Sequence, residues 1–170
     1  MEVILLMVQS VDGKIAKNSK HNSISWSSKE DTKHFVKLTK EIGTIIMGSN
    51  TFESYGQKVL PGRINIIMTS HPERYEKKEG VEFFSGTATK LVQDLAEEGV
   101  NRVILAGGTS INTAFLEARL INEIYLTIEP IIFGDGMALF NKEMDNINLK
   151  LLSTSKLNQN TLLFHYKVIH

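Results

Sequence analysis

The chain has 170 residues, of which 42% are apolar and 22% charged, and this is enough apolar material for one full hydrophobic core. Lys and Arg together number 19, as do Asp and Glu, so the formal net charge is zero and no excess of positive charge favours nucleic acid as a partner. The absence of cysteine excludes disulfides, thiolate catalysis and cysteine-ligated zinc, and it suits a reducing compartment. We therefore expect one domain, spanning residues 1–170, in the cytoplasm.

The first apolar run extends from Met1 to Val8. It has no basic segment before it and soon meets Asp12 and Lys14, so we expect neither a signal peptide nor a membrane span, and no membrane partner. The pattern instead predicts a buried strand over residues 3–8, which leaves the sheet through a turn at Asp12-Gly13.

A polar loop leads into the first predicted helix. The loop, Lys17 to Ser25, shows no periodicity, and its composition fits a mobile lid beside a site and a solvated connector equally well. Ser27 can cap the helix, with Glu30 completing a capping box. The helix then runs to about Ile42, and Gly43 ends it.

One face of this helix carries an acid. Asp31, Phe35, Leu38 and Ile42 recur at spacings of four, three and four residues, which places a carboxylate at the head of an apolar stripe. A plain structural explanation is available, because an acid in the first turn complements the helix dipole. A carboxyl partly withdrawn from water would instead have a raised pKa and could orient a ligand or assist its protonation.

The next polar stretch lies between two short apolar strands, Thr44 to Met47 and Ile64 to Met68. Gly48-Ser49-Asn50-Thr51 opens a helical turn whose backbone N–H groups suit phosphate. Leu60-Pro61-Gly62-Arg63 forms a tight turn that holds one arginine, which could bind a carboxylate or be a plain surface charge. Thr69-Ser70-His71 ends the second strand at a carboxyl edge, where α/β sheets bind ligands.

The chain then continues to alternate strands and helices. The predicted elements are a strand over 81–84, a helix that ends at Gly99 and buries Ala88, Leu91, Val92 and Leu95, and a strand over 102–106. Gly107-Gly108-Thr109-Ser110 follows at once and opens a helix with the predicted inward side chains Ile111, Ala114, Phe115 and Ala118. This is a second helix start suited to phosphate, although a simple tight turn explains the glycine pair equally well.

The C-terminal part is rich in strands. Asn122 to Glu129 reads as a strand, and the segment 130–140 is apolar but broken by glycine. Residues 149–157 and 161–169 form a closing antiparallel pair that turns near Gln159-Asn160. Together the elements predict the α/β class, with a mixed, mainly parallel central sheet, helices on its faces and a C-terminal antiparallel hairpin.

The stretch from Met47 to Ile66 carries a specific motif, MG-x-x-T-F-ES-x-G followed by LPGR-x-NI. Through it the chain resembles the dihydrofolate reductase family, and the matching residues are Met47, Gly48, Thr51, Glu53, Ser54, Gly56, Leu60, Pro61, Gly62, Arg63, Asn65 and Ile66. The resemblance implies a dihydrofolate reductase-like three-layer sandwich. It also implies an oxidoreductase that reduces dihydrofolate to tetrahydrofolate by hydride transfer from NADPH.

The resemblance assigns substrate roles to individual residues. Trp26, Asp31 and Phe35 reproduce the family spacing around the acid that binds the pterin ring, so Asp31 would orient dihydrofolate and help to protonate it. Thr127 would hydrogen-bond to Asp31, and Arg63 would bind the α-carboxylate of the glutamate tail. The other implied contacts of the substrate and its ring pocket are Val8, Ile15, Phe35 and Leu60.

The implied cofactor contacts gather at the two glycine turns and at the end of the strand 64–68. They are Val8, Ile15, Gly48, Ser49, Asn50, Thr51, Thr69, Ser70, His71, Gly107, Gly108, Thr109, Ser110 and Ile111, with residues 69–71 available to a 2′-phosphate. The chain departs from the family where Ser49 and Ser110 replace arginines that contact the cofactor's phosphates, and where Asn112 replaces a frequent tyrosine near the nicotinamide. These departures bear on the preference for NADPH over NADH.

Two other functions remain open from the sequence. The segments Ser10 to Ala16 and Ala106 to Gly136 look more like the pyrimidine reductase domain of riboflavin biosynthesis, which reduces a ribosylamino-pyrimidine phosphate with NADPH. That family lacks both the LPGR turn and the acid five residues after the tryptophan, which favours dihydrofolate. A non-catalytic nucleotide-binding domain is a third possibility, because fold alone does not imply activity. The histidines show no metal-ligand spacing, so we expect no metal, and we expect a monomer or a homodimer.

Overall fold

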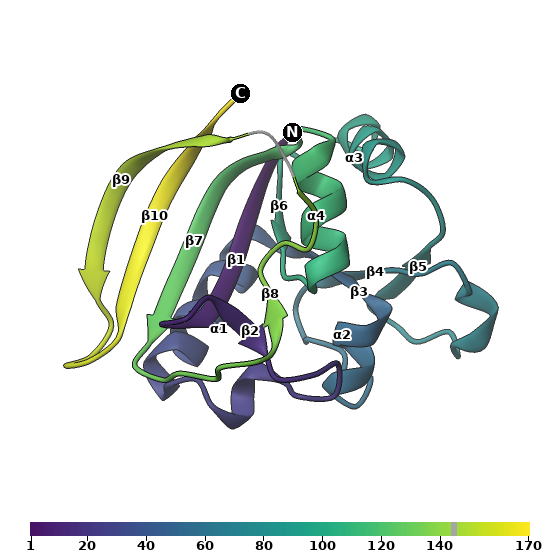
Figure 1. Ribbon diagram of the computed structural model, residues 1–170. Helices are drawn as coiled ribbons and strands as arrows, with labels where there is room; N and C mark the ends of the chain where they lie inside the picture. Colours follow the sequence, from purple (N-terminus) through teal and green to yellow (C-terminus); the bar gives the residue numbers. More distant parts are fainter. Residues whose placement is uncertain (144–145) are drawn as a thin grey trace.

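The computed structural model describes residues 1–143 and 146–170 and is built on one eight-stranded sheet (Figure 1). The order of its strands is β5-β4-β3-β6-β1-β7-β10-β9. Their bounds are β1 Glu2–Ser10, β3 Thr44–Gly48, β4 Ile64–Met68, β5 Val81–Phe84, β6 Arg102–Leu105, β7 Ile121–Glu129, β9 Asn148–Lys156 and β10 Leu162–Ile169. The pairs from β5 to β7 are parallel, and β10 is antiparallel to both β7 and β9. The predicted mixed sheet with a closing hairpin is therefore confirmed.

Among the described residues, four α-helices cover the sheet, namely α1 Lys29–Ile42, α2 Ser49–Ser54, α3 Ala88–Glu97 and α4 Thr109–Glu117. A second, two-stranded sheet pairs β2 Lys14–Ala16 with β8 Met137–Ala138, and Ser23–Ser25 and Pro72–Arg74 form single 3₁₀ turns. In Figure 1, α3 and α4 lie over the face of the sheet that is opposite α1. The arrangement is the expected three-layer sandwich.

The alternation of side chains along the strands builds two core clusters. On β1, Val3 and Leu5 belong to the cluster under α3 and α4, whereas Ile4 and Leu6 belong to the cluster that packs against α1 and α2. Each of these side chains is at most 4% exposed, and burial of such a side chain contributes about 1.5–3 kcal/mol. Both faces of the central strands are therefore buried, as their continuous apolar runs predict.

The first helix begins one residue later than predicted. The N-cap is Ser28, whose Oγ accepts the backbone N–H of Asp31 at 3.2 Å, so the predicted cap at Ser27 is wrong. Gly43 ends the helix as expected, with a φ of 85° that other residues rarely adopt and an N–H that donates to the Thr39 carbonyl at 3.0 Å.

The inward face of α4 also differs from the prediction. Phe115 is buried as expected, but Ala118 is exposed, and Asn112, Thr113 and Leu116 are buried. The reason is that the segment after β8 packs along this helix. The Asn112 amide donates to the Leu139 carbonyl at 3.1 Å, and the Thr113 hydroxyl donates to Asn141 Oδ1 at 2.8 Å.

Asp12 joins the loop after β1 to the loop before β8. Its carboxylate accepts the Ser10 hydroxyl at 2.6 Å and the backbone N–H groups of Phe133 and Gly134 at 3.1 and 2.7 Å. The Ser10 hydrogen bond, followed by that from Phe133, lowers the pKa of Asp12 from 3.8 to about 2. None of the helices in the described part of the chain has the length and apolar character that a membrane crossing needs.

Candidate active site

Asp31 lies buried in the first turn of α1, with only 8% of its surface exposed. Burial raises the pKa of this carboxyl above its ordinary value of 3.8; hydrogen bonding by the Thr127 and Ser27 side chains lowers it in part, and the charge of Glu129 raises it further. The apolar stripe after it is confirmed, because Phe35, Leu38 and Ile42 all pack against the core cluster on this face. An acid in this setting can hold a proton at a higher pH than an exposed one.

Two buried polar atoms, one of them on Thr127 beside Asp31, are left unpaired by the described part of the protein. In the described part of the chain, the Thr127 hydroxyl and the Trp26 indole N–H are buried and have no partner in regular hydrogen-bond geometry. Thr127 nevertheless lies close enough to Asp31 to lower its pKa, and it is paired in register with Val8 of β1. Buried polar groups in native proteins are normally satisfied, so a polar ligand is a fitting partner for these two.

Arg63 lies in the turn just before β4 and packs against the later part of α1. Only 8% of it is exposed, and it donates to the Thr39 hydroxyl at 3.0 Å and to the carbonyls of Pro61 and Val36 at 3.0 and 3.3 Å. Burial lowers the pKa of its guanidinium below the ordinary value for arginine. A guanidinium has five N–H donors, so roughly two remain after these three bonds. The arginine is thus not a free surface charge, because three of its donors bind within the protein.

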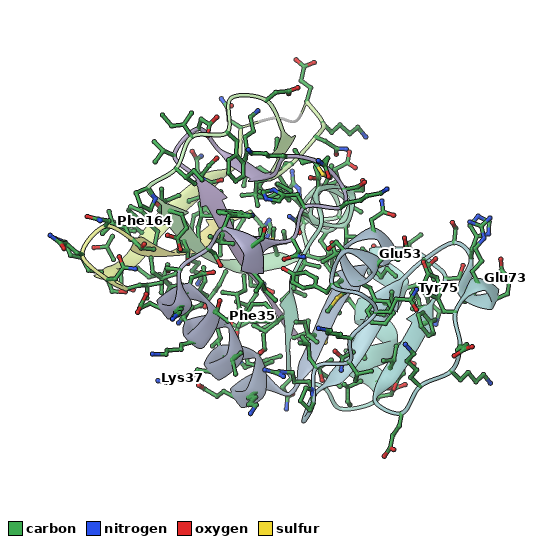
Figure 2. The ribbon with its side chains drawn as sticks, turned by 90° about the horizontal axis from the view of Figure 1, so that it is seen from below. Phe35, Lys37, Glu53, Glu73, Tyr75 and Phe164 are labelled. Atoms are coloured by element: carbon green, nitrogen blue, oxygen red, sulfur yellow. The ribbon has the colours of Figure 1, made fainter. Side chains whose placement is uncertain are left out.

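Helix α1 sets the separation between the acid and the arginine. Asp31 lies at its start, and Arg63 is bound to Thr39, eight positions later, which corresponds to roughly 12 Å along the helix axis. Phe35 and Leu60 lie partly buried against the same core cluster, and Figure 2 shows Phe35 on the inner side of α1 and Lys37 directed away from it. Asp31 and the contacts of Arg63 therefore lie near opposite ends of α1.

The two glycine turns are in direct contact. The Gly48 N–H donates to the Gly107 carbonyl at 2.8 Å, so the ends of β3 and β6 form one surface. A Cβ at Gly48 would lie 2.8 Å from Ile111 Cγ1, one at Gly108 would lie 3.1 Å from Thr51 Oγ1, and Gly107 has a φ of 89°. The close packing at Gly48 and Gly108 and the positive φ of Gly107 thus account for the glycines without a ligand, and Gly48 and Gly107 are both buried.

Some of the polar side chains beside the two glycine turns form hydrogen bonds within the protein. The Thr109 hydroxyl donates to the Ala138 carbonyl at 2.7 Å, whereas Asn112 Oδ1 is buried and lacks a partner among the described residues. This oxygen would lie 3.7 Å from a Cβ at Gly107, so an unpaired acceptor borders the glycine turn. Of the other predicted cofactor residues, Asn50 and Ser110 are exposed, and Ile15 on β2 is buried.

The third predicted group, Thr69-Ser70-His71, lies at the end of β4, beyond β3 from the glycine pair. The hydroxyl of Tyr75 lies there too and hydrogen-bonds to Glu53 (Figure 2). Burial is the main cause that raises the pKa of Tyr75, with Glu53 adding to it and Ser49 and Thr69 opposing it. His71 Nδ1 lies 3.2 Å from Glu73 Oε1. Ser49 and Thr69, two residues predicted to bind the cofactor, thus both lie close enough to Tyr75 to affect its pKa.

Sequence reasoning missed two residues near these sites. Tyr75 lies in a charged connector that gives no signal of its stacking on Phe83, with ring centroids 4.8 Å apart. Glu129 ends a strand and is only 4% exposed, although its side chain reaches the start of α1. Neither role has a local signature, because each depends on a contact between distant segments.

The chain matches a family model over residues 2–167, and the family is described as dihydrofolate reductase. An uncharacterised protein of Bacillus subtilis, YwjB, is 27% identical over 174 residues, which cover 97% of both chains. The dihydrofolate reductase of Ureaplasma parvum is 35% identical over 112 residues, which cover 66% of both chains.

Solved structures with the same fold come from both branches suggested by the sequence. A candidate riboflavin biosynthesis protein of Shewanella sp. PV-4 aligns with a TM-score of 0.84 and 21% identity and covers 100% of both chains. The dihydrofolate reductase of Enterococcus faecalis, solved with NADP(H), aligns with a TM-score of 0.79 and 22% identity over 99% of this chain and 97% of its own. These likenesses support the fold, and the family model gives the assignment: the chain belongs to the dihydrofolate reductase family.

Proposed function

We propose that the protein reduces 7,8-dihydrofolate to tetrahydrofolate with NADPH. The observation that carries this proposal is a pair of residues. Asp31 is a buried acid with a raised pKa, and Arg63, only some of whose donors are bonded within the protein, contacts α1 about 12 Å further along the helix axis. A dihydrofolate molecule has a pterin ring at one end and a glutamate carboxylate at the other. Its two recognition groups match this pair in kind.

In this proposal, Asp31 accepts hydrogen bonds from the 2-amino group and the ring N–H of the pterin and holds the ring against Phe35. Thr127 supports Asp31, and the two N–H groups that Arg63 keeps free bind the α-carboxylate of the tail. Because burial raises the pKa of Asp31, this acid helps to deliver the proton that N5 gains during the reaction. Arrangement of the reacting rings within contact distance supplies much of the rate enhancement.

The proposed NADPH site comprises the joined turns at Gly48 and Gly107, with Thr69, Ser70 and His71 near the 2′-phosphate. The fit rests on the unpaired Asn112 oxygen, which borders the Gly107 turn. When bound, NADPH supplies the hydride that C6 of the pterin receives. Serine in place of arginine at positions 49 and 110 gives weaker phosphate binding than in relatives that have these arginines.

A pyrimidine reductase of riboflavin biosynthesis is the second candidate. Arg63 favours it in one respect, since three of its donors are already satisfied within the protein and its burial needs no ligand. The acid at Asp31 argues for dihydrofolate, because the pyrimidine reductases lack an acid at this place.

Oxidation of NADPH by the purified protein, followed by absorbance, separates these functions. One sample contains dihydrofolate and the other the ribosylamino-pyrimidine phosphate, with the protein omitted as the blank. We expect turnover with dihydrofolate alone. Turnover with the pyrimidine alone would contradict the proposal, and binding of NADPH without turnover of either substrate would favour a non-catalytic domain.

A further inference from the structure

Glu129 is a buried carboxylate that the proposed reaction does not use directly. It ends β7, is 4% exposed, and both of its oxygens accept hydrogen bonds. The backbone N–H of Ser28 donates to Oε1 at 2.7 Å, and the hydroxyl of Thr161 donates to Oε2 at 2.7 Å. Glu129 therefore joins the start of α1 to the residue before β10.

The contact with Ser28 completes the cap of α1 from a distance. In a capping box, the side chain of the third helical residue accepts the N–H of the N-cap residue. Here the third residue is Asp31, and the N-cap N–H of Ser28 goes to Glu129 instead. Ser28 Oγ still accepts the Asp31 N–H at 3.2 Å, which is the other half of the box. The Asp31 carboxyl is thereby released from capping and faces Thr127.

The charges around Asp31 come from several elements. On α1, Glu30 accepts the Asn158 amide at 3.2 Å and has Lys29 and Lys33 beside it, while Lys37 acts on His34. The carboxylate of Asp12, in the loop after β1, is taken up by loop N–H groups. From β7, the charge of Glu129 is the one that acts on Asp31 and raises its pKa.

We propose that Glu129 is a positioning residue that holds the first turn of α1 through Ser28 and so presents the Asp31 carboxyl to the substrate. The inference rests on the proposed function only in taking Asp31 as the substrate-binding acid. It identifies the residue that allows an acid at the third position of a helix to serve a ligand. Its charge has a second effect, because a negative neighbour makes it harder to ionise Asp31.

A titration of the Asp31 carboxyl by carbon NMR, on the full chain without substrate, tests this role. Glu129→Gln keeps an oxygen for the Ser28 N–H and removes the charge, so the midpoint of the Asp31 titration should move to lower pH. Glu30→Gln is the control. It also removes a negative charge, from the residue before Asp31, but the Glu30 side chain is bonded to Asn158, so the midpoint of the Asp31 titration should not change. An equal midpoint in Glu129→Gln and the wild type would overturn the charge effect.

Hydrogen exchange tests the positioning directly. Glu129→Ala should speed exchange of the Ser28 and Asp31 amides by roughly tenfold or more, because a buried hydrogen bond to a charged acceptor is lost. Glu129→Gln should retain most of the protection. Unchanged exchange in Glu129→Ala would contradict the proposal. If that variant does not fold, Glu129→Asp, whose carboxylate is one methylene shorter, takes its place, and unchanged exchange of the Ser28 amide there has the same meaning. Because no substrate is present, failure to reduce dihydrofolate would leave these results intact and would count against the proposed function alone.

Discussion

At the scale of single residues, Asp31 shows a conflict between stability and the proposed activity. Burial is the largest cause of its raised pKa, and the opposing hydrogen bonds from Thr127 and Ser27 do not cancel it. A carboxyl with a raised pKa in the folded state stabilises the protein fully below the unfolded value of 3.8. This contribution is lost as the pH rises through the folded value. Ionised Asp31 therefore destabilises the folded protein at neutral pH.

Replacement of this acid by its amide should stabilise the protein where the acid is ionised. We expect Asp31→Asn to have a higher free energy of unfolding than the wild type at pH 7, with the difference shrinking as the pH falls toward 3.8. Urea unfolding at a series of pH values measures both curves. A variant that is less stable than the wild type at neutral pH would show that ionised Asp31 stabilises the fold.

The same substitution should remove most of the proposed activity. Asparagine has no proton to deliver and cannot accept both hydrogen bonds of the pterin, so kcat for dihydrofolate reduction should fall by roughly 100-fold or more. Glu30→Gln, on the same turn of α1, is the matched control and should keep the wild-type rate. Turnover by Asp31→Asn at the wild-type rate would return Asp31 to a purely structural role.

At the scale of elements, the contact between the β3–α2 turn and α4 is tight enough to test by overpacking. A methyl group at Gly48 would lie 2.8 Å from Ile111 Cγ1, so Gly48→Ala should lower the free energy of unfolding by about 1–3 kcal/mol. Ile111→Ala removes the opposing atom, so Gly48→Ala should lower the free energy of unfolding by less in the Ile111→Ala background than in the wild type. A double-mutant cycle by urea unfolding should give a favourable coupling of about 0.5–3 kcal/mol. If the losses in free energy of unfolding from the two single substitutions simply add in the double variant, the strain caused by Gly48→Ala does not come from Ile111.

The element scale also explains what the sequence could predict. The strand 64–68 agrees residue for residue with its apolar run, because a buried parallel strand has a continuous local pattern. The strand 81–84 also agrees, although it lies at the edge of the sheet and exposed Glu82 interrupts its run. The start of α1 could not be fixed in this way. Ser27 and Ser28 are equally good caps by local chemistry, and the choice falls to Ser28, whose N–H reaches Glu129 across 101 positions of sequence.

Polar contacts between distant segments account for the error on α4. An apolar stripe cannot reveal that Asn112 and Thr113 are buried, because their partners Leu139 and Asn141 lie beyond β8. The same holds for Arg63, whose turn was predictable but whose bonds to Thr39 and Val36 were not. The motif residues could thus be identified from the sequence. The hydrogen-bond partners of their side chains could be identified only from the structure.

At the scale of the whole molecule, the order of strands brings the proposed sites to one edge of the sheet. β3, β6, β1 and β7 are neighbours, so Gly48, Gly107, Val8 and Thr127 all lie at the carboxyl ends of adjacent parallel strands. Helix α1 crosses the opposite face from α4 and carries Asp31 at one end and the Arg63 contacts near the other. An elongated substrate along α1 would therefore present its ring to a cofactor held at the strand ends.

The length of α1 makes the tail of the substrate the most direct test. We would measure kcat/KM of the wild type and of Arg63→Leu for dihydrofolate and for a dihydropterin that lacks the glutamate tail. Loss of the bonds to Thr39 and Val36 affects both substrates alike, so the ratio of the two values within each protein isolates the carboxylate contact. The wild type should prefer dihydrofolate by roughly 10- to 100-fold, the effect of a charge-assisted hydrogen-bond pair, and Arg63→Leu should lose this preference. An equal preference in both proteins would contradict the account.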